Sequence, residues 1–170
     1  SLHSSFDVYL ADRENIRSLY LAINDEDVRI QERAVVLIGR LTDLNPACVL
    51  PCLRTTLIQL LAEMDAVDDG RTEGGSARLL GVLIRSAPRL AKPYVAPVLE
   101  ALIRRLEHPA GCSSAVAASG LGAIGELSVV GSALVKEKAE KLFRLAIDGL
   151  QDQSSTLKRQ IALRTLGQLV

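Results

Sequence analysis

A short pattern that occurs four times along the chain constrains its fold more than any other feature. It consists of a small residue, a glycine five positions later and a leucine two positions after the glycine. The four copies are AVVLIGRL (34–41), SARLLGVL (76–83), GLGAIGEL (120–127) and ALRTLGQL (162–169). Their glycines, Gly39, Gly81, Gly125 and Gly167, are spaced by 42, 44 and 42 residues. A repeat of this length predicts stacked helical units rather than one globular arrangement.

The spacing inside each copy indicates a helix. With about 3.6 residues per turn, the small residue, the apolar residue four positions later and the leucine seven positions later share one face. Glycine costs about 1 kcal/mol relative to alanine inside a helix, so its recurrence predicts a point where another backbone passes closely. The period lies within the roughly 40–47 residues of HEAT and armadillo units. We therefore expect an all-α fold, an armadillo-like α-solenoid of HEAT-type antiparallel helix pairs.

Prolines mark the start of a second helix in two of the units. Pro46 and Pro88 each lie seven residues after a repeat glycine, and Pro51 and Pro93 each lie twelve after it. Because proline fits a turn or the first turn of a helix, these pairs predict the same corner in successive units. The third unit has Ser132 in place of the first proline but keeps the helical spacing.

The repeat divides the chain into one array. The expected parts are the end of a preceding repeat (1–24), three full repeats (25–66, 67–108 and 109–152) and the first helix of a further repeat (153–170). Segments rich in Asp, Gly and Ser at 65–73, 108–114 and 151–155 separate the units. The first residue is Ser1 and Val170 lies within an apolar-periodic segment, so we expect a piece of a longer protein.

Composition agrees with packed helices and excludes several classes. Aromatic residues make up only 3% of the chain, which disfavours a β-sandwich. Twenty basic residues balance twenty acidic ones, so no overall charge favours nucleic acid or an acidic membrane. Three cysteines do not make a disulfide framework and indicate reduced thiols of the cytosol or nucleus. No apolar run approaches about 20 residues, so no transmembrane segment is expected.

Two motifs invite a ligand-binding interpretation. GLGAIG (120–125) is a formal GxGxxG, but a dinucleotide site needs a preceding strand and a helix that opens at the motif. Here Gly125 is a repeat glycine and Gly120 holds the small position, so the repeat accounts for both. The segment 65–70 carries three acids before a glycine, yet Val67 and Ser76 stand where a calcium loop needs oxygen ligands. A solvated loop is the better interpretation.

Other reactive side chains form no predicted site. Cys48 and Cys52 stand four apart on one helix, but zinc would need two more ligands, and the histidines, His3 and His108, are remote. Small buried side chains are the better interpretation, and Cys112 has no reactive partner in the sequence. There is no GxSxG elbow and no Cys/His pair. No catalytic, cofactor-binding or metal-binding residue is predicted, and the partner-binding residues are unknown.

Two basic clusters could bind an acidic partner. They are the pair Arg104 and Arg105 and the group Lys136, Lys138 and Lys141. The lysines alternate with glutamates, which is typical of a solvated helix face. An ordinary surface is therefore the simpler interpretation of both clusters.

Longer strings give a more specific resemblance. LYLAINDEDVRIQERAVVLIGRL (19–41), NPACVLPCLRTTLIQLL (45–61), SARLLGVLIRSAPRLAKPYVAPVLEALI (76–103), AIGELSVVG (123–131) and LQDQSSTLKRQIALRTLGQLV (150–170) closely resemble the HEAT-repeat region of target of rapamycin (TOR) kinases. The similarity runs in order over nearly the whole chain. HPAGCSSAVAASGLG (108–122) departs from it, being richer in Ala and Gly than that family would suggest.

The resemblance implies a function. TOR proteins are large serine/threonine kinases of the phosphatidylinositol-3-kinase-related family, and their HEAT solenoid holds Raptor-type and Rictor-type subunits and helps to form the dimer. Such a segment would be a non-catalytic scaffold in nutrient and growth signalling. ATP and Mg would belong to a kinase domain outside it, since no HRD, DFG or ATP-binding glycine loop is found here. The implied location is cytoplasmic, with endomembrane association through the parent complex.

Two alternatives remain open at this stage. A protein-binding segment of another HEAT family, such as a phosphatase scaffold or a transport receptor, would show the same periodicity. An enzyme would show measurable nucleotide affinity at residues 120–125.

Overall fold

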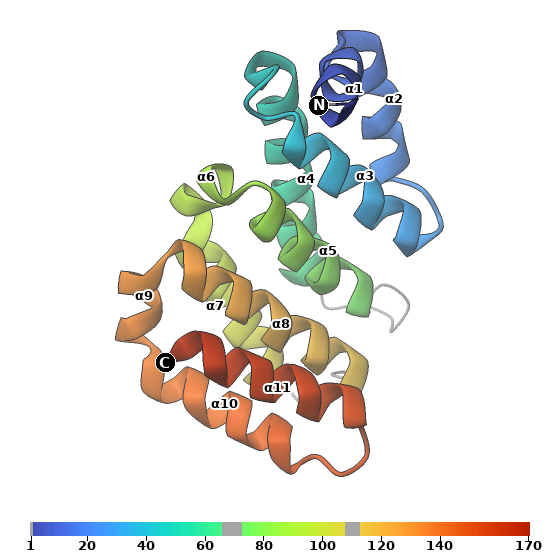
Figure 1. Ribbon diagram of the computed structural model, residues 1–170. Coiled ribbons are helices and arrows are strands. Elements are labelled where there is room, and N and C mark those ends of the chain that lie inside the picture. The colour runs from blue at the N-terminus through green and yellow to red at the C-terminus, as the bar shows by residue number, and fades with distance from the viewer. Residues whose placement is uncertain (1, 66–72, 108–112) are drawn as a thin grey trace.

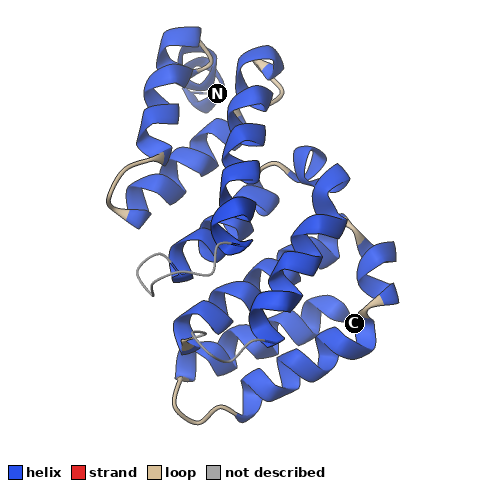
Figure 2. Ribbon diagram, turned by 180° about the vertical axis from the view of Figure 1, so that it is seen from behind, coloured by secondary structure: helices blue, strands red, loops and turns tan. Residues whose placement is uncertain are grey.

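The computed structural model describes residues 2–65, 73–107 and 113–170, and within these ranges the chain is helical and contains no strand (Figure 2). The helices are α1 (Leu2–Leu10), α2 (Arg13–Ile23), α3 (Val28–Arg40), α4 (Pro46–Asp65), α5 (Glu73–Ser86), α6 (Pro88–Ala91), α7 (Val95–Glu107), α8 (Ser114–Val130), α9 (Ser132–Glu137), α10 (Ala139–Gln151) and α11 (Thr156–Leu169), with a 3₁₀ turn η1 (Lys92–Tyr94). The all-α prediction is confirmed.

The helices form two layers that run the length of the molecule. Helices α3, α5, α8 and α11, which carry the repeat pattern, lie side by side in one layer (Figure 1). Helices α2, α4, α7 and α10 contact one another in sequence as the second layer behind them. We call these the first and second layers. This arrangement is the predicted α-solenoid.

Side-chain caps fix where several helices begin. The Asp27 carboxylate accepts a hydrogen bond of 2.8 Å from the Arg29 amide at the start of α3. Ser113 and Ser155 cap α8 and α11 in the same way, each through its hydroxyl oxygen. Such caps satisfy amides that the first helical turn leaves without partners. The repeat boundaries at 67 and 109 fall outside the described residues, and the division into units stays a prediction.

The second-layer helices are less uniform than the proline spacing suggested. Pro51 lies inside α4 rather than at a corner, whereas Pro93 lies in η1, where α6 gives way to α7. A proline inside a helix removes the hydrogen bond to the carbonyl four residues earlier, here that of Ala47. Ala47 is exposed, so water can satisfy this carbonyl and α4 continues. In the third unit the helix also breaks, between α9 and α10 at Lys138.

The two layers enclose an aliphatic core. One cluster of buried side chains extends from α2 to α10, and a smaller one lies among α8, α10 and α11. The largest side chains in the core are all Ile or Leu, and they are Ile16, Ile38, Leu41, Leu53, Leu57, Leu80, Leu83, Ile84, Leu99, Leu102, Leu121 and Ile124. The half-buried Leu106 and Leu145 pack against both clusters and connect them, so hydrophobic contacts extend along the array, as expected of a solenoid.

Two of the four repeat glycines lie where first-layer helices cross closely. A Cβ atom on Gly39 would stand 2.8 Å from the carbonyl oxygen of Ser86 at the end of α5. A Cβ atom on Gly81 would stand 3.4 Å from the Cα atom of Ala123 in α8. The predicted close approach of another backbone is therefore confirmed at these two positions. Gly125 faces the side chain of Gln168 instead.

One helix meets the length and apolarity of a membrane span. It is α4 over Pro46–Met64, and among the described residues no other helix does so. The sequence expectation of no such run therefore needs this correction. In the fold, α4 buries Leu53 and Leu57 completely and exposes Arg54, Gln59 and Glu63. A helix with one buried and one polar face is typical of the core of a helical array, and the composition is weak evidence for a membrane.

Candidate interaction surfaces

The GxGxxG segment is a packing element of α8. The helix begins at Ser114, so residues 120–125 lie well inside it rather than at its N-terminus. A Cβ atom on Gly120 would meet the Leu106 side chain of α7 at 3.3 Å, and Gly125 is buried against α11. A pyrophosphate needs free backbone amides at a helix start. These residues therefore hold helices together, as the repeat pattern predicted.

The cysteine pair is accessible but forms no metal site. Cys48 and Cys52 are half-buried on α4 and line a groove against Arg13, Ile16 and Tyr20 of α2. Burial and the nearby Cys48 raise the pKa of the Cys52 thiol, which lowers its reactivity as a thiolate. Among the described residues, no group of three or more His, Cys, Asp or Glu side chains could hold a metal ion.

Several residues discussed in the sequence analysis lie outside the residues that the structure describes. The acidic segment considered and rejected as a calcium loop lies almost wholly at residues 66–72, outside the described ranges. The same is true of Cys112 and His108.

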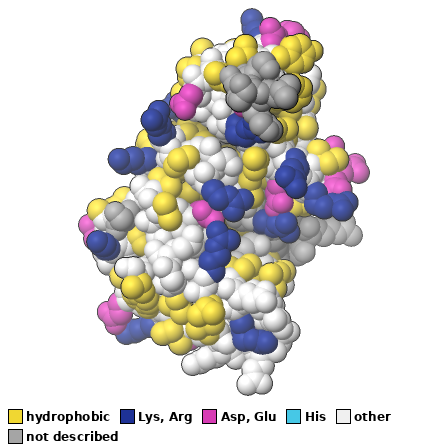
Figure 3. Space-filling model, viewed as in Figure 1, with side chains coloured by type: hydrophobic (Ala, Val, Ile, Leu, Met, Phe, Trp, Pro, Cys, Tyr) yellow, Lys and Arg dark blue, Asp and Glu magenta, His cyan; other side chains and the backbone are white. Residues whose placement is uncertain are grey.

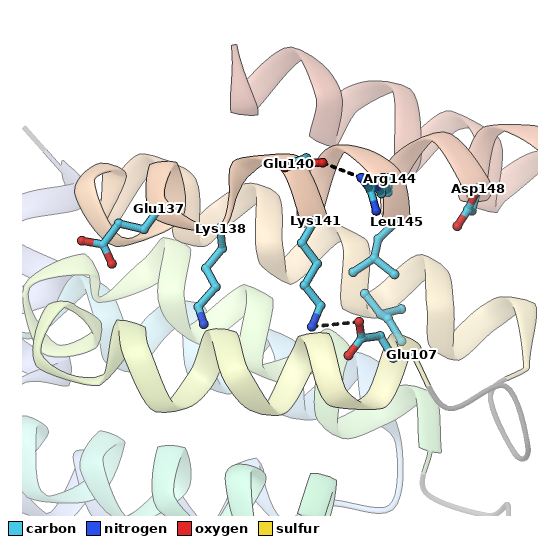
Figure 4. A pocket seen from close by; sticks show the side chains of 9 residues that line it. Glu107, Glu137, Lys138, Glu140, Lys141, Arg144, Leu145 and Asp148 are labelled. Carbon is cyan, nitrogen blue, oxygen red and sulfur yellow. Dashed lines mark hydrogen bonds and ion pairs between the residues drawn. The ribbon is translucent and has the colours of Figure 1, made fainter.

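A groove of about 740 Å³ separates α7 from α10 in the second layer (Figure 4). Lys138 and Lys141 point from the α9–α10 segment across the groove toward α7, and the Lys141 ammonium lies 2.8 Å from the Glu107 carboxylate. Glu140 and Arg144 form an ion pair along α10. The remaining lining residues are Leu106, Glu137, Leu145 and Asp148. Four acids and three bases line the groove, which fits a solvated face rather than a dedicated site for an acidic partner.

The other predicted basic residues lie apart from this groove. Lys136 is exposed on α9. Arg104 is exposed and Arg105 is half-buried near the end of α7. The structure therefore brings only Lys138 and Lys141 of the two basic clusters to one surface.

A series of ion pairs links neighbouring helices of the first layer and joins α1 to α3, and we call it the arginine ladder. Its pairs are Arg40 with Asp7 (2.6 Å), Arg78 with Glu32, Arg85 with Glu126 (3.5 Å) and Arg164 with Glu126 (2.9 Å). Together they connect α1 to α3, α3 to α5, α5 to α8 and α8 to α11. Figure 3 shows basic and acidic side chains gathered over this face.

Hydrogen bonds strengthen the last of these contacts. The buried Thr165 hydroxyl of α11 donates to the Leu121 carbonyl of α8 at 2.8 Å. The Ser128 hydroxyl shares its proton between the Gly125 carbonyl of its own helix, at 2.7 Å, and the Gln168 carbonyl of α11, at 3.0 Å. A buried hydroxyl without a partner costs free energy, so these bonds also fix the orientation of α11 on α8.

Sequence reasoning missed the arginine ladder, although a signal for part of it was present. Arg78 and Arg164 each lie three residues before a repeat glycine, and Gly122 holds that position in α8. The first copy has Val36 at this position, so comparing the four copies places Arg78 and Arg164 on equivalent faces of α5 and α11 and gives no sign of the other pairs.

Fold and surfaces together define a class: a HEAT-type α-solenoid whose first-layer helices are held in fixed register.

No protein-family model matches the chain. Known proteins do. The chain is 43% identical over 168 residues to the serine/threonine-protein kinase TOR of Oryza sativa subsp. japonica, covering 98% of this chain and 7% of that protein. It is 44% identical over 168 residues to serine/threonine-protein kinase TOR2 of Saccharomyces cerevisiae, covering 99% of this chain and 7% of that protein. It is 40% identical over 172 residues to serine/threonine-protein kinase mTor of Drosophila melanogaster, with 100% and 7% covered.

The chain therefore belongs to the TOR kinase family, as a segment. It spans about 7% of the length of these relatives. The resemblance seen in the sequence is confirmed, and it favours TOR over another HEAT-repeat scaffold.

Proposed function

We propose that this segment is a non-catalytic scaffold of a TOR serine/threonine-protein kinase. The observation that carries the proposal is the stacking of the first layer, where close glycine crossings join α3 to α5 and α5 to α8, and ion pairs of the arginine ladder join every neighbouring pair of helices. A segment built for internal stacking presents a long, shaped surface to other proteins. Its similarity to TOR kinases over nearly its whole length supports the assignment to that complex.

The wider role follows from this scaffold. In the proposal, the parent kinase carries its ATP and Mg²⁺ in a catalytic domain outside this segment. The protein partners are Raptor-type and Rictor-type subunits and a second copy of the parent, within a cytoplasmic complex that associates with endomembranes. The segment contributes shape and contact surface to nutrient and growth signalling.

The test uses the full-length parent kinase with charge reversals on each layer in turn. Arg78→Glu with Glu32→Arg changes the first-layer surface while it preserves an ion pair, and Arg54→Glu changes the second layer. We expect at least one change to reduce recovery of a Raptor-type or Rictor-type subunit by immunoprecipitation. Phosphorylation of a small peptide substrate should stay unchanged, because the catalytic domain is elsewhere. Normal complex assembly in every variant would refute the scaffold role.

A further inference from the structure

The first-layer face contains a groove that the arginine ladder surrounds. It has a volume of about 380 Å³ and lies across α5, α8 and α11. We call it the ladder groove. Small residues of α8, including Ala118, Ser119 and Gly122, form its floor, and its walls include Leu157 and Ile161 of α11.

The groove lies where a repeat position that is Val36 in α3 and arginine in α5 and α11 is a glycine in α8. Arg78 of α5 and Arg164 of α11 lie three residues before their repeat glycines, and Gly122 holds the same position in α8. The hollow therefore lies between two arginines that rise from equivalent places. A Cβ atom on Gly122 would find only Ile161 within 4 Å, at 3.5 Å, so close packing does not require a glycine there.

The exposed charge around the groove is positive. The side chains of Arg78, Arg85 and Arg164 are 58%, 53% and 61% exposed, whereas those of Glu32 and Glu126 are only 18% and 13% exposed. A partner therefore meets guanidinium groups, with the carboxylates beneath them. Each guanidinium has five N–H donors and uses only some of them to bind a glutamate. The remaining N–H groups can bind a second carboxylate through two hydrogen bonds.

We propose that the ladder groove binds a short acidic segment of a partner protein, with an apolar side chain over Gly122 and carboxylates on Arg78 and Arg164. The apolar side chain of the proposed ligand is inferred from Leu157, which is 56% exposed, and from Ile161. Together they form an apolar wall that a purely charged ligand would not contact. The acidic part follows from the arginines at both sides. The proposal rests on the scaffold function and specifies one contact surface for it.

A random dodecapeptide library displayed on phage, selected on the 170-residue chain, provides the direct test. We expect enriched peptides to carry Leu, Ile or Phe flanked by Asp or Glu. Fluorescence anisotropy of one such labelled peptide should show binding that weakens as salt rises, because partly exposed ion pairs are screened. Inorganic phosphate alone should not compete at the ionic strength of the assay.

Two variants separate the apolar and the charged parts. Gly122→Met fills the floor and should weaken peptide binding about tenfold or more. The combination of Arg78→Gln, Glu32→Gln, Arg164→Gln and Glu126→Gln removes the two arginines proposed to bind the ligand and their glutamates without altering the net charge. It leaves Arg85 in place and should weaken binding about fivefold, as expected for two partly exposed pairs. Arg54→Gln, an exposed arginine of the second layer, is the matched control and should bind normally. Circular dichroism melting confirms that each variant is folded.

Several results would overturn the proposal. They are enrichment of basic peptides or of none, unchanged binding in both groove variants, competition by inorganic phosphate alone, or self-association of the chain through this face. If these occur while other surface changes still impair assembly of the full-length kinase complex, the ladder groove fails and the scaffold function stands. If assembly is also unaffected, both fail.

Discussion

The close crossing of α3 and α5 makes a strong prediction about two repeat glycines. A Cβ atom on Gly39 would meet the backbone of Ser86, whereas a Cβ atom on Gly167 would have no neighbour within 4 Å. Both glycines occupy the same place in the repeat pattern and both lie in helices. Gly39→Ala and Gly167→Ala therefore make a matched pair, in which the added methyl group is the same and only its surroundings differ.

The size of the difference follows from the geometry. A Cβ atom on Gly39 would lie 2.7 Å from the Ser86 Cβ atom and 2.8 Å from its carbonyl oxygen. Carbon atoms in contact prefer about 3.5 Å, and neither Ser86 atom can rotate away, so α3 and α5 must separate locally. Overpacking of this kind costs about 1–3 kcal/mol. The gain in helix propensity from Gly to Ala, about 1 kcal/mol, is common to both variants and cancels.

Thermal unfolding followed by circular dichroism measures the difference. For a chain of this length each kcal/mol shifts the Tm by about 2–4 °C, so Gly39→Ala should melt about 2–12 °C below Gly167→Ala. Gly81→Ala should fall between them, because its Cβ atom would meet Ala123 only at ordinary contact distance, 3.4 Å from the Cα atom. Equal Tm values for Gly39→Ala and Gly167→Ala would refute the claim that the repeat glycine serves helix crossing.

Three further outcomes test the contacts between units. Thr165→Val removes the bond to the Leu121 carbonyl and should lower the free energy of unfolding by about 0.5–1.5 kcal/mol in urea; no loss would mean that the bond adds nothing. Glu126→Gln deprives two arginines of their carboxylate and should cost about 0.5–1 kcal/mol at low salt and less at high salt; a salt-independent loss would argue against ion pairing. The hydrogen bond from Arg29 lowers the pKa of Asp27 to about 2 from 3.8, so its contribution to stability is present above pH 3.8 and is lost as pH falls toward 2. Asp27→Asn should flatten the acid limb of a stability–pH profile, and an unchanged limb would contradict that role.

Local periodicity explains why so much of the fold could be predicted. The face shared by residues such as Ala34, Ile38 and Leu41 depends only on helix geometry, and all three are buried as expected. The repeat length then places successive helices in one layer. The breaks at η1 and at Lys138 were not predictable in the same way, because they depend on how each second helix fits its neighbours.

The contact surfaces were less predictable for a geometric reason. Glu32 lies seven residues before Gly39 of its own helix. It pairs with Arg78, which lies three residues before Gly81 of the neighbouring helix. Arg85 lies four residues after Gly81. It pairs with Glu126, which lies one residue after Gly125 of the neighbouring helix. The two offsets have opposite signs, so the ion pair between one pair of helices does not predict the ion pair between the next. Such pairs depend on crossing angle and position along the axis, which the sequence of one helix does not contain.

The small residues of α8 unite the main observations. They produced the formal nucleotide motif, they are the main departure from the TOR resemblance, and they form the floor of the ladder groove. If the ladder groove binds a ligand, Gly122 should contribute to ligand binding and not to the stability of the fold. Gly122→Ala adds a methyl group at ordinary contact distance from Ile161 and improves helix propensity, so it should raise the free energy of unfolding by about 0.5–1 kcal/mol. The same change should weaken binding of the acidic peptide, since the methyl group occupies the floor. A lower Tm would show that Gly122 is there for packing, and the groove would then be a by-product of the helix contact.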